Sequence, residues 1–137
     1  MFKNIMIPVD LAHADTLDKA MEVAGRLAKE HGAKLHLVSV TGELPSKLGH
    51  SSEELGARLQ SHARHMAEDY NIKTESHAIA STDPAAEVDG ALLKAVKDTG
   101  CDLVVMGSHQ PGWMEYIFSS HAGHMAQHAK VSVFVVR

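Results

Sequence analysis

Apolar residues follow two alternating periodicities along the chain. Short, nearly continuous apolar runs have the length of strands, and between them apolar residues recur every three or four positions, as on one face of an amphipathic helix. The short runs predict strands over residues 3–10, 34–40, 73–80, 102–107 and 131–137. The longer stretches predict helices over about residues 17–31, 51–70, 84–99 and 120–129.

Helix boundaries carry local signals. Gly32 and Gly100 each follow the last apolar position of a helical stretch, where a C-cap glycine is common. Asp83 followed by Pro84 is typical of an N-cap and a first helical residue. These signals support the division into alternating strands and helices.

The predicted order βαβαβαβαβ indicates a single α/β domain over residues 1–137. Strands separated by helices pair in parallel through right-handed crossovers, so we expect an open five-stranded parallel sheet with helices on both faces. In such sheets a ligand lies beyond the carboxyl ends of the strands, where the strand order reverses. The first and fourth runs are the most apolar candidates for adjacent central strands, so their ends, Asp10 and Gly107, mark the expected site.

Composition narrows the functional classes. The formal net charge is −4 with neutral histidines, which argues against a nucleic-acid partner. No apolar run approaches the length of a membrane span, and Cys101 is the only cysteine. We therefore expect a soluble, cytoplasmic protein that is not membrane-embedded.

The stretch "MGSHQPGWMEYIFSSHAGHMAQH", residues 106–128, carries the strongest candidate chemistry. Small residues after a strand and again before a helix allow a ligand to come close to the backbone. The N-terminus of a helix also attracts anions. A plain loop with a helix cap would show the same residues. The pattern is neither a Walker A loop nor the Gly-x-Gly-x-x-Gly dinucleotide turn.

The chain resembles the universal stress protein family, short-loop ATP-binding type, over nearly its whole length. The resemblance is carried by "NIMIPVDL", "LHLVSVTG", "DLVVMGSH" and "HAKVSVFVVR". It implies a Rossmann-like sheet of order 3-2-1-4-5, of the adenine nucleotide alpha hydrolase-like type, and ATP binding through a Gly-x2-Gly-x9-Gly-Ser/Thr motif. It also implies homodimers built through the last strand, residues 131–137, and in some members a link to membrane transporters.

The resemblance also assigns site residues. Asp10 matches the residue that holds the ribose, and Val40 matches the one whose backbone meets adenine. Independently of the resemblance, His121 lies in the first turn of the predicted helix, where it could donate a hydrogen bond to phosphate. The full set of expected nucleotide-binding residues is Pro8, Val9, Asp10, Val40, Met106, Gly107, His109, Gln110, Ser119, Ser120 and His121.

Departures from the family motif affect the phosphate end. Gln110 and Ser119 stand where the motif has glycines, and the loop lacks the usual Lys or Arg. The backbone therefore approaches the phosphates less closely, and backbone dipoles, a divalent cation such as Mg²⁺, or histidinium must neutralise them. ATP is the expected ligand, with AMP, ADP or an empty site as alternatives.

Three functions remain open from the sequence: a nucleotide-sensing regulator that acts through a partner, a slow ATP hydrolase, and a nucleotide-free interaction module. Asp10 and His109 are the only candidates for assisting phosphate chemistry, so no catalytic residue is assigned. His62 with His65, and His121 with His124 and His128, have helical spacings that can bind metal. No acidic or cysteine ligand accompanies them, so solvated helix faces are favoured and no metal site is predicted.

Overall fold

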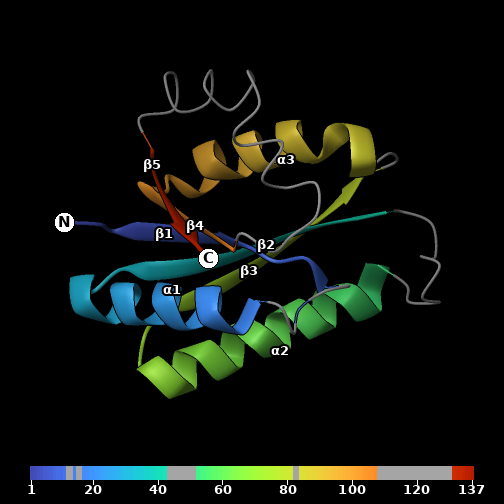
Figure 1. The fold of residues 1–137 in the computed structure, drawn as a ribbon. Helices are drawn as coiled ribbons and strands as arrows, with labels where there is room; N and C mark the ends of the chain where they lie inside the picture. Colours follow the sequence, from blue (N-terminus) through green and yellow to red (C-terminus); the bar gives the residue numbers. More distant parts are fainter. Residues whose placement is uncertain (12–13, 15–16, 43–51, 82–83, 108–130) are drawn as a thin grey trace.

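The computed structural model describes residues 1–11, 14, 17–42, 52–81, 84–107 and 131–137. These residues form a five-stranded parallel sheet and three helices (Figure 1). The elements are, in chain order, β1 (Asn4–Pro8), α1 (Asp18–His31), β2 (Lys34–Gly42), α2 (Ser52–Tyr70), β3 (Thr74–Ser81), α3 (Pro84–Thr99), β4 (Leu103–Gly107) and β5 (Ser132–Val136). The predicted helix over 120–129 lies outside the described residues.

The strand order is β3-β2-β1-β4-β5, with every neighbouring pair parallel. This confirms the predicted order 3-2-1-4-5. It also confirms that the apolar strand β4 lies inside the sheet, with all five of its residues buried, while the more polar β3 lies at an edge.

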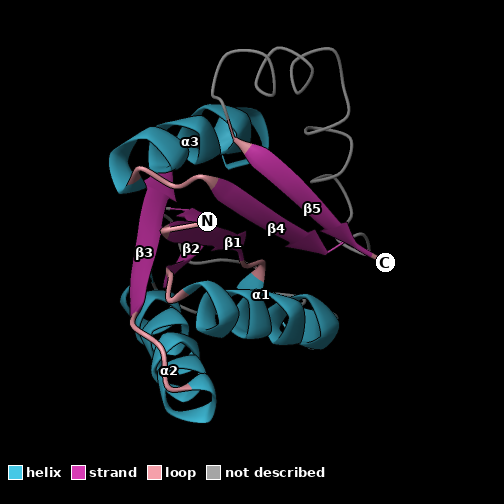
Figure 2. Cartoon of the chain, turned by 90° about the vertical axis from the view of Figure 1, so that its left-hand side faces the viewer, coloured by secondary structure: helices cyan, strands magenta, loops and turns pink. Residues whose placement is uncertain are grey.

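Two apolar layers hold the helices against the sheet. α1 and α2 cover one face and α3 covers the other, which confirms helices on both faces (Figures 1 and 2). Because side chains alternate along a strand, Ile5 and Ile7 of β1 pack with α1 and α2, whereas Met6 packs with α3. The α1–α2 layer buries Ala20, Ala24, Ala28, Leu59, Ala63 and Met66, and the α3 layer buries Leu92, Ala95 and Val96.

The two predicted C-cap glycines have the conformation that the position needs. Gly32 has φ 63° and Gly100 has φ 61°, in the left-handed region that glycine enters without a Cβ penalty. After Gly32, the N–H of Ala33 donates to the carbonyl of Ala28 at 2.8 Å, which closes the end of α1. Asp83, the predicted N-cap of α3, lies outside the described residues.

Asp102 ties the start of β1 to the start of β4. Its carboxylate accepts the backbone N–H of Lys3 at 2.9 Å and that of Asn4 at 3.2 Å. The two central strands therefore start level with each other, which places their carboxyl ends side by side. Within the described ranges, no helix combines the length and the apolar character needed to cross a membrane.

Candidate functional site

The carboxyl ends of β1 and β4 form the candidate ligand site. β1 pairs with β4 through Ile5–Leu103 and Met6–Val104. After β1 the chain crosses to β2 on one side, and after β4 it crosses to β5 on the other, so this is the point where the strand order reverses. Crevices at such points are where ligands bind in open parallel sheets. We call Pro8, Val9, Asp10, Met106 and Gly107 the carboxyl edge.

Pro8 explains why the paired register of β1 and β4 stops before the strands end. The N–H of Val9 donates to the carbonyl of Val38 in β2 at 2.7 Å. Because donors alternate sides along a strand, the nitrogen of Pro8 faces β4. Proline has no N–H, so the ladder between β1 and β4 cannot continue at this position. The two strands are therefore free to separate at the carboxyl edge.

Burial distinguishes the residues of the carboxyl edge. Val9 and Met106 are buried and belong to the apolar layers, so their side chains fill the core and only their backbone is available to a ligand. Asp10 is half-buried at the end of β1, where its carboxylate follows a buried apolar run. Asp10 is the one polar side chain among the five residues of the carboxyl edge.

Gly107 lies close to α1. A Cβ at this position would lie 3.1 Å from Cδ2 of Leu17 and 3.6 Å from Cβ of Ala20. The glycine therefore allows β4 to approach α1, in addition to any role in ligand binding. Val40 lies one strand further on, in β2, where it pairs with Ile79 and packs partly buried in the α3 layer.

The structure brings together six of the eleven predicted nucleotide-binding residues along the ends of β1, β2 and β4. The other five lie outside the described residues: His109, Gln110, Ser119, Ser120 and His121. One cationic group does approach the segment after β1. Arg58 of α2 donates from Nη2 to the carbonyl of Leu11 at 3.3 Å, and so holds this segment against α2.

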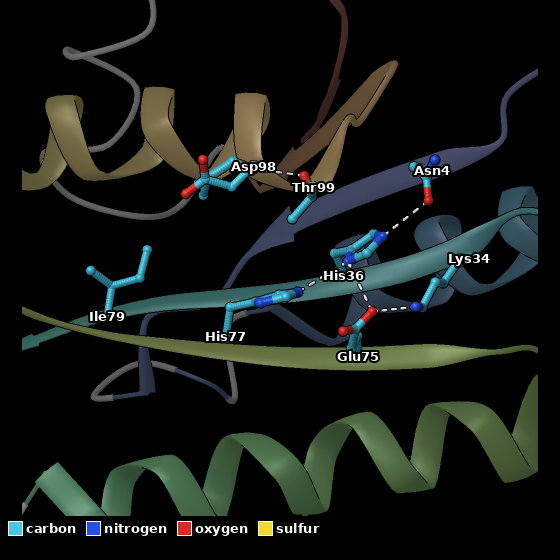
Figure 3. Close-up of a pocket in the computed structure, with 9 residues that line it drawn as sticks. Asn4, Lys34, His36, Glu75, His77, Ile79, Asp98 and Thr99 are labelled. Atoms are coloured by element: carbon cyan, nitrogen blue, oxygen red, sulfur yellow. Dashed lines mark hydrogen bonds and ion pairs between the residues drawn. The ribbon is translucent and has the colours of Figure 1, made fainter.

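A second polar group lies on the α3 face of the sheet, toward the amino ends of β2 and β3 (Figure 3). We call His36, Glu75 and His77 the histidine cluster. His36 and Glu75 are register partners, and His77 lies two residues beyond Glu75, hence on the same face. Nδ1 of His36 lies 3.0 Å from Nε2 of His77 and 3.8 Å from Oε2 of Glu75.

The surroundings shift the pKa values of this cluster. Burial lowers the pKa of His36, and His77 and Lys34 act in the same direction while Glu75 opposes them. The pKa of Glu75 is lowered chiefly by its hydrogen bond with Lys34, which also forms an ion pair with it. The cluster therefore holds a carboxylate and a buried imidazole that is kept neutral.

The remaining sequence candidates fall elsewhere. On α2, His65 is exposed, as predicted for a solvated helix face, but His62 is half-buried and its pKa is lowered, first by burial and then by Arg58. Cys101 is buried, and burial raises the pKa of its thiol to about 11. A neutral, buried thiol is a poor nucleophile.

A parallel sheet of order β3-β2-β1-β4-β5 with helices on both faces belongs to the Rossmann-like α/β class. A sequence profile of the universal stress protein family matches residues 1–137, the whole chain. The chain is also 31% identical over 148 aligned positions to universal stress protein G of Escherichia coli O157:H7, with both sequences covered completely. This chain belongs to the universal stress protein family.

Solved structures share the fold. The universal stress protein of Archaeoglobus fulgidus in complex with dAMP superposes with a TM-score of 0.66 at 17% identity, covering 98% of each chain. A universal stress protein family member of Arabidopsis thaliana with AMP bound superposes with a TM-score of 0.65 at 16% identity, covering 98% of this chain and 90% of the other. At these identities the likeness shows the fold.

The sequence analysis did not identify the histidine cluster. The one local signal was the pattern "ESH" in a predicted strand, since residues two apart on a strand share a face. His36 is 39 positions away along the chain from Glu75 and 41 from His77, and the register of β2 against β3 is what joins them.

Proposed function

We propose that this chain is a regulator that binds an adenine nucleotide at the carboxyl edge and acts through a homodimer. The observation that carries the proposal is the end of the β1–β4 ladder just before Pro8, at the point where the strand order reverses, with Asp10 half-buried two residues further on. A carboxylate is a two-oxygen acceptor suited to the two hydroxyls of a ribose. The nucleotide complexes of the two solved family members of the same fold support an adenine nucleotide as the ligand.

ATP is the nucleotide we favour, with Mg²⁺ as its counter-ion. The residues that would hold it are Asp10 on the ribose side and the backbone around Gly107 on the phosphate side. The chain carries a net negative charge, so its overall field does not attract a triphosphate. Mg²⁺ would supply the neutralisation that a Lys or Arg in the phosphate loop supplies in other family members. AMP and ADP need less neutralisation and remain the alternatives.

The proposed dimer interface is β5. This strand lies at the edge of the sheet, paired only with β4 among the described strands. Val133 is 38% exposed and Phe134 is 46% exposed, which is unusual for large apolar side chains on a strand. Apolar edge strands are templates for pairing with a second chain. A second copy of β5 would bury these side chains and complete the edge.

Nucleotide occupancy would regulate this protein through its partners. A ligand shifts a conformational equilibrium only by its differential affinity for the two states, so the partner must distinguish the nucleotide-bound form from the free form. A membrane transporter is one such partner. The setting in this proposal is the cytoplasm, in keeping with a single cysteine that is buried as a free thiol.

Mass spectrometry of the gently purified protein tests the proposal directly. We expect an adenine nucleotide to co-purify in a stoichiometric amount, and calorimetry on the stripped protein to rank AMP, ADP and ATP with and without Mg²⁺. If nothing co-purifies and no adenine nucleotide binds at millimolar concentration, the chain is a nucleotide-free interaction module. Steady turnover of ATP that Mg²⁺ accelerates would instead favour a hydrolase.

A further inference from the structure

We propose that His36, Glu75 and His77 bind a divalent transition-metal ion of the zinc class. Each residue offers one ligand atom, and the three atoms all lie within 4.8 Å of one another. Two imidazole nitrogens and a carboxylate oxygen form a donor set that Zn²⁺ prefers, with a fourth position for water. The cluster lies at the amino ends of β2 and β3, at the opposite end of the strands from the carboxyl edge, so it is a separate site.

The three ligand atoms lie close enough to share one metal ion after rotation of the side chains that are not fully buried. Zinc bonds of about 2.0–2.2 Å in a tetrahedron separate neighbouring ligand atoms by roughly 3.3–3.5 Å. The two separations around Nδ1 of His36 are 3.0 Å to His77 and 3.8 Å to Glu75, one on each side of that value. The third separation, between the ligand atoms of His77 and Glu75, is at most 4.8 Å, so rotation of these two side chains would have to shorten it by up to about 1.5 Å. His77 and Glu75 are free to make this adjustment because neither is fully buried.

Asn4 orients the buried ligand. Its Oδ1 lies 3.1 Å from Nε2 of His36 (Figure 3). An amide oxygen only accepts hydrogen bonds, so Nε2 of His36 carries the proton and Nδ1 presents its lone pair toward Glu75 and His77. This arrangement, in which the second ring nitrogen donates to a fixed acceptor, is the common support of a metal-binding histidine.

Metal binding requires one rearrangement of protons. Without metal, Nε2 of His77 donates its proton to the lone pair of His36 Nδ1. Coordination through Nε2 of His77 requires the other tautomer, in which the proton sits on Nδ1. The exchange moves one proton of His77 from Nε2 to Nδ1 by way of the solvent.

Lys34 is the competitor for this site. Its Nζ forms an ion pair with the same Oε2 of Glu75 that faces His36. Both side chains are roughly half exposed, so Lys34 can turn into solvent and leave the carboxylate to the metal. The charge of Lys34 nevertheless opposes a divalent cation nearby. Removal of that charge should therefore strengthen metal binding.

An open pocket gives the ion access. A cavity of about 340 Å³ lies beside the cluster, between β3 and the last turn of α3, with Asp98 and Thr99 at its α3 side. Asp98 adds a negative charge to this pocket without belonging to the three-ligand set. A bound ion would join β3, the edge strand, to β2, and through Asn4 to β1.

Calorimetric titration of the EDTA-treated, nucleotide-free full chain with ZnCl₂ at pH 7.5 tests this site. We expect one binding event that His77→Gln weakens at least a hundredfold. Asn4→Ala should weaken it about tenfold to a hundredfold, and Lys34→Gln should strengthen it severalfold. The matched control is His65→Gln, which removes an exposed histidine of α2 and should leave the affinity unchanged.

Two further readouts keep the test decisive. Zn²⁺ should raise the melting temperature of the wild type by several degrees and have no effect on His77→Gln, whose own fold is checked by circular dichroism. Co²⁺ should give the visible absorption of a tetrahedral complex in the wild type only. Equal zinc affinity in the wild type and His77→Gln would overturn the proposal, as would weaker binding in Lys34→Gln. Neither result would bear on nucleotide binding, because Asp10 is absent from this site.

Discussion

The ring of Tyr70 fills the space that a side chain at Gly25 would occupy. A Cβ built on Gly25 would lie 2.6 Å from two ring carbons of Tyr70 and 2.9 Å from a third. Gly25 lies in the middle of α1 and Tyr70 at the last position of α2. The absence of a side chain on one helix thus allows the aromatic ring of the other to pack closely against it.

Gly25→Ala should therefore destabilise the protein. Alanine is favoured over glycine in a helix by about 1 kcal/mol, but overpacking against a ring costs roughly 1–3 kcal/mol. We expect the overpacking to prevail, since the contact involves the ring near its attachment to the backbone. Urea unfolding should show a lower midpoint.

Gly90→Ala is the matched control, because Gly90 lies in α3 with nothing within 4 Å of its Cβ position. This variant should gain up to about 1 kcal/mol. Equal gains in both variants would show that Tyr70 moves aside freely.

Asp10→Ala should weaken adenine nucleotide binding. A hydrogen bond to a carboxylate contributes roughly 1.5–3 kcal/mol, which corresponds to an affinity loss of about ten- to a hundredfold. Calorimetry with AMP and ATP measures the loss, and Asp69→Ala on the exposed face of α2 controls for the change in net charge. Unchanged affinity in Asp10→Ala would remove this residue from the site.

Val133→Glu should dissociate the proposed dimer. The N–H of Ser132 donates to the carbonyl of Asp102, so the N–H of the next residue, Val133, points to the free edge of β5. A second copy paired along this edge would bury the new carboxylate among apolar side chains, which is unfavourable for a charge without a partner. Sedimentation should show a dissociation constant raised at least tenfold.

The control for this interface is Ala80→Glu, on the exposed part of the opposite edge strand, β3. It should leave association unchanged. If the dimer persists in Val133→Glu but dissociates in Ala80→Glu, the interface lies at β3 and not at β5.

The stability of the fold should fall as the pH drops below about 6.5. The pKa of His36 is lowered in the folded chain, first by burial and then by His77. Between its unfolded value and its folded value, the unfolded chain therefore binds more protons, and acid favours unfolding. Around His36, Lys34 adds to this effect, Glu75 opposes it, and Asp98 faces the same pocket from α3.

Denaturant unfolding from pH 7.5 to 5.0 measures this dependence. His36→Gln should reduce the slope in that window, and His62, whose pKa is also lowered by burial, should account for a remaining part. The lowered pKa of Glu75 contributes separately, because its stabilisation is lost only as the pH falls below about 4.5. A wild-type curve that stays flat from pH 6.5 to 5.0 would contradict the assigned state of His36.

The amino-acid sequence by itself determined the order and type of the described elements. The apolar periods are local properties of the chain, so β1, β2, β4 and their helices could be predicted within a few residues. The parallel pairing followed from the helical crossovers, and the apolar runs ending at Asp10 and Gly107 placed the carboxyl edge. The resemblance to the family supplied the strand order and the identity of the expected ligand.

Only the tertiary structure decided how distant positions meet. The register of β2 against β3 joins His36 to Glu75 and His77, and a shift of one residue would turn those side chains to opposite faces. The alternation of backbone donors along β1 directs the nitrogen of Pro8 toward β4. The packing of α1 on α2 brings Gly25 into contact with the ring of Tyr70. Local periodicity contains no information on register or helix packing, because both depend on contacts between segments far apart in the chain.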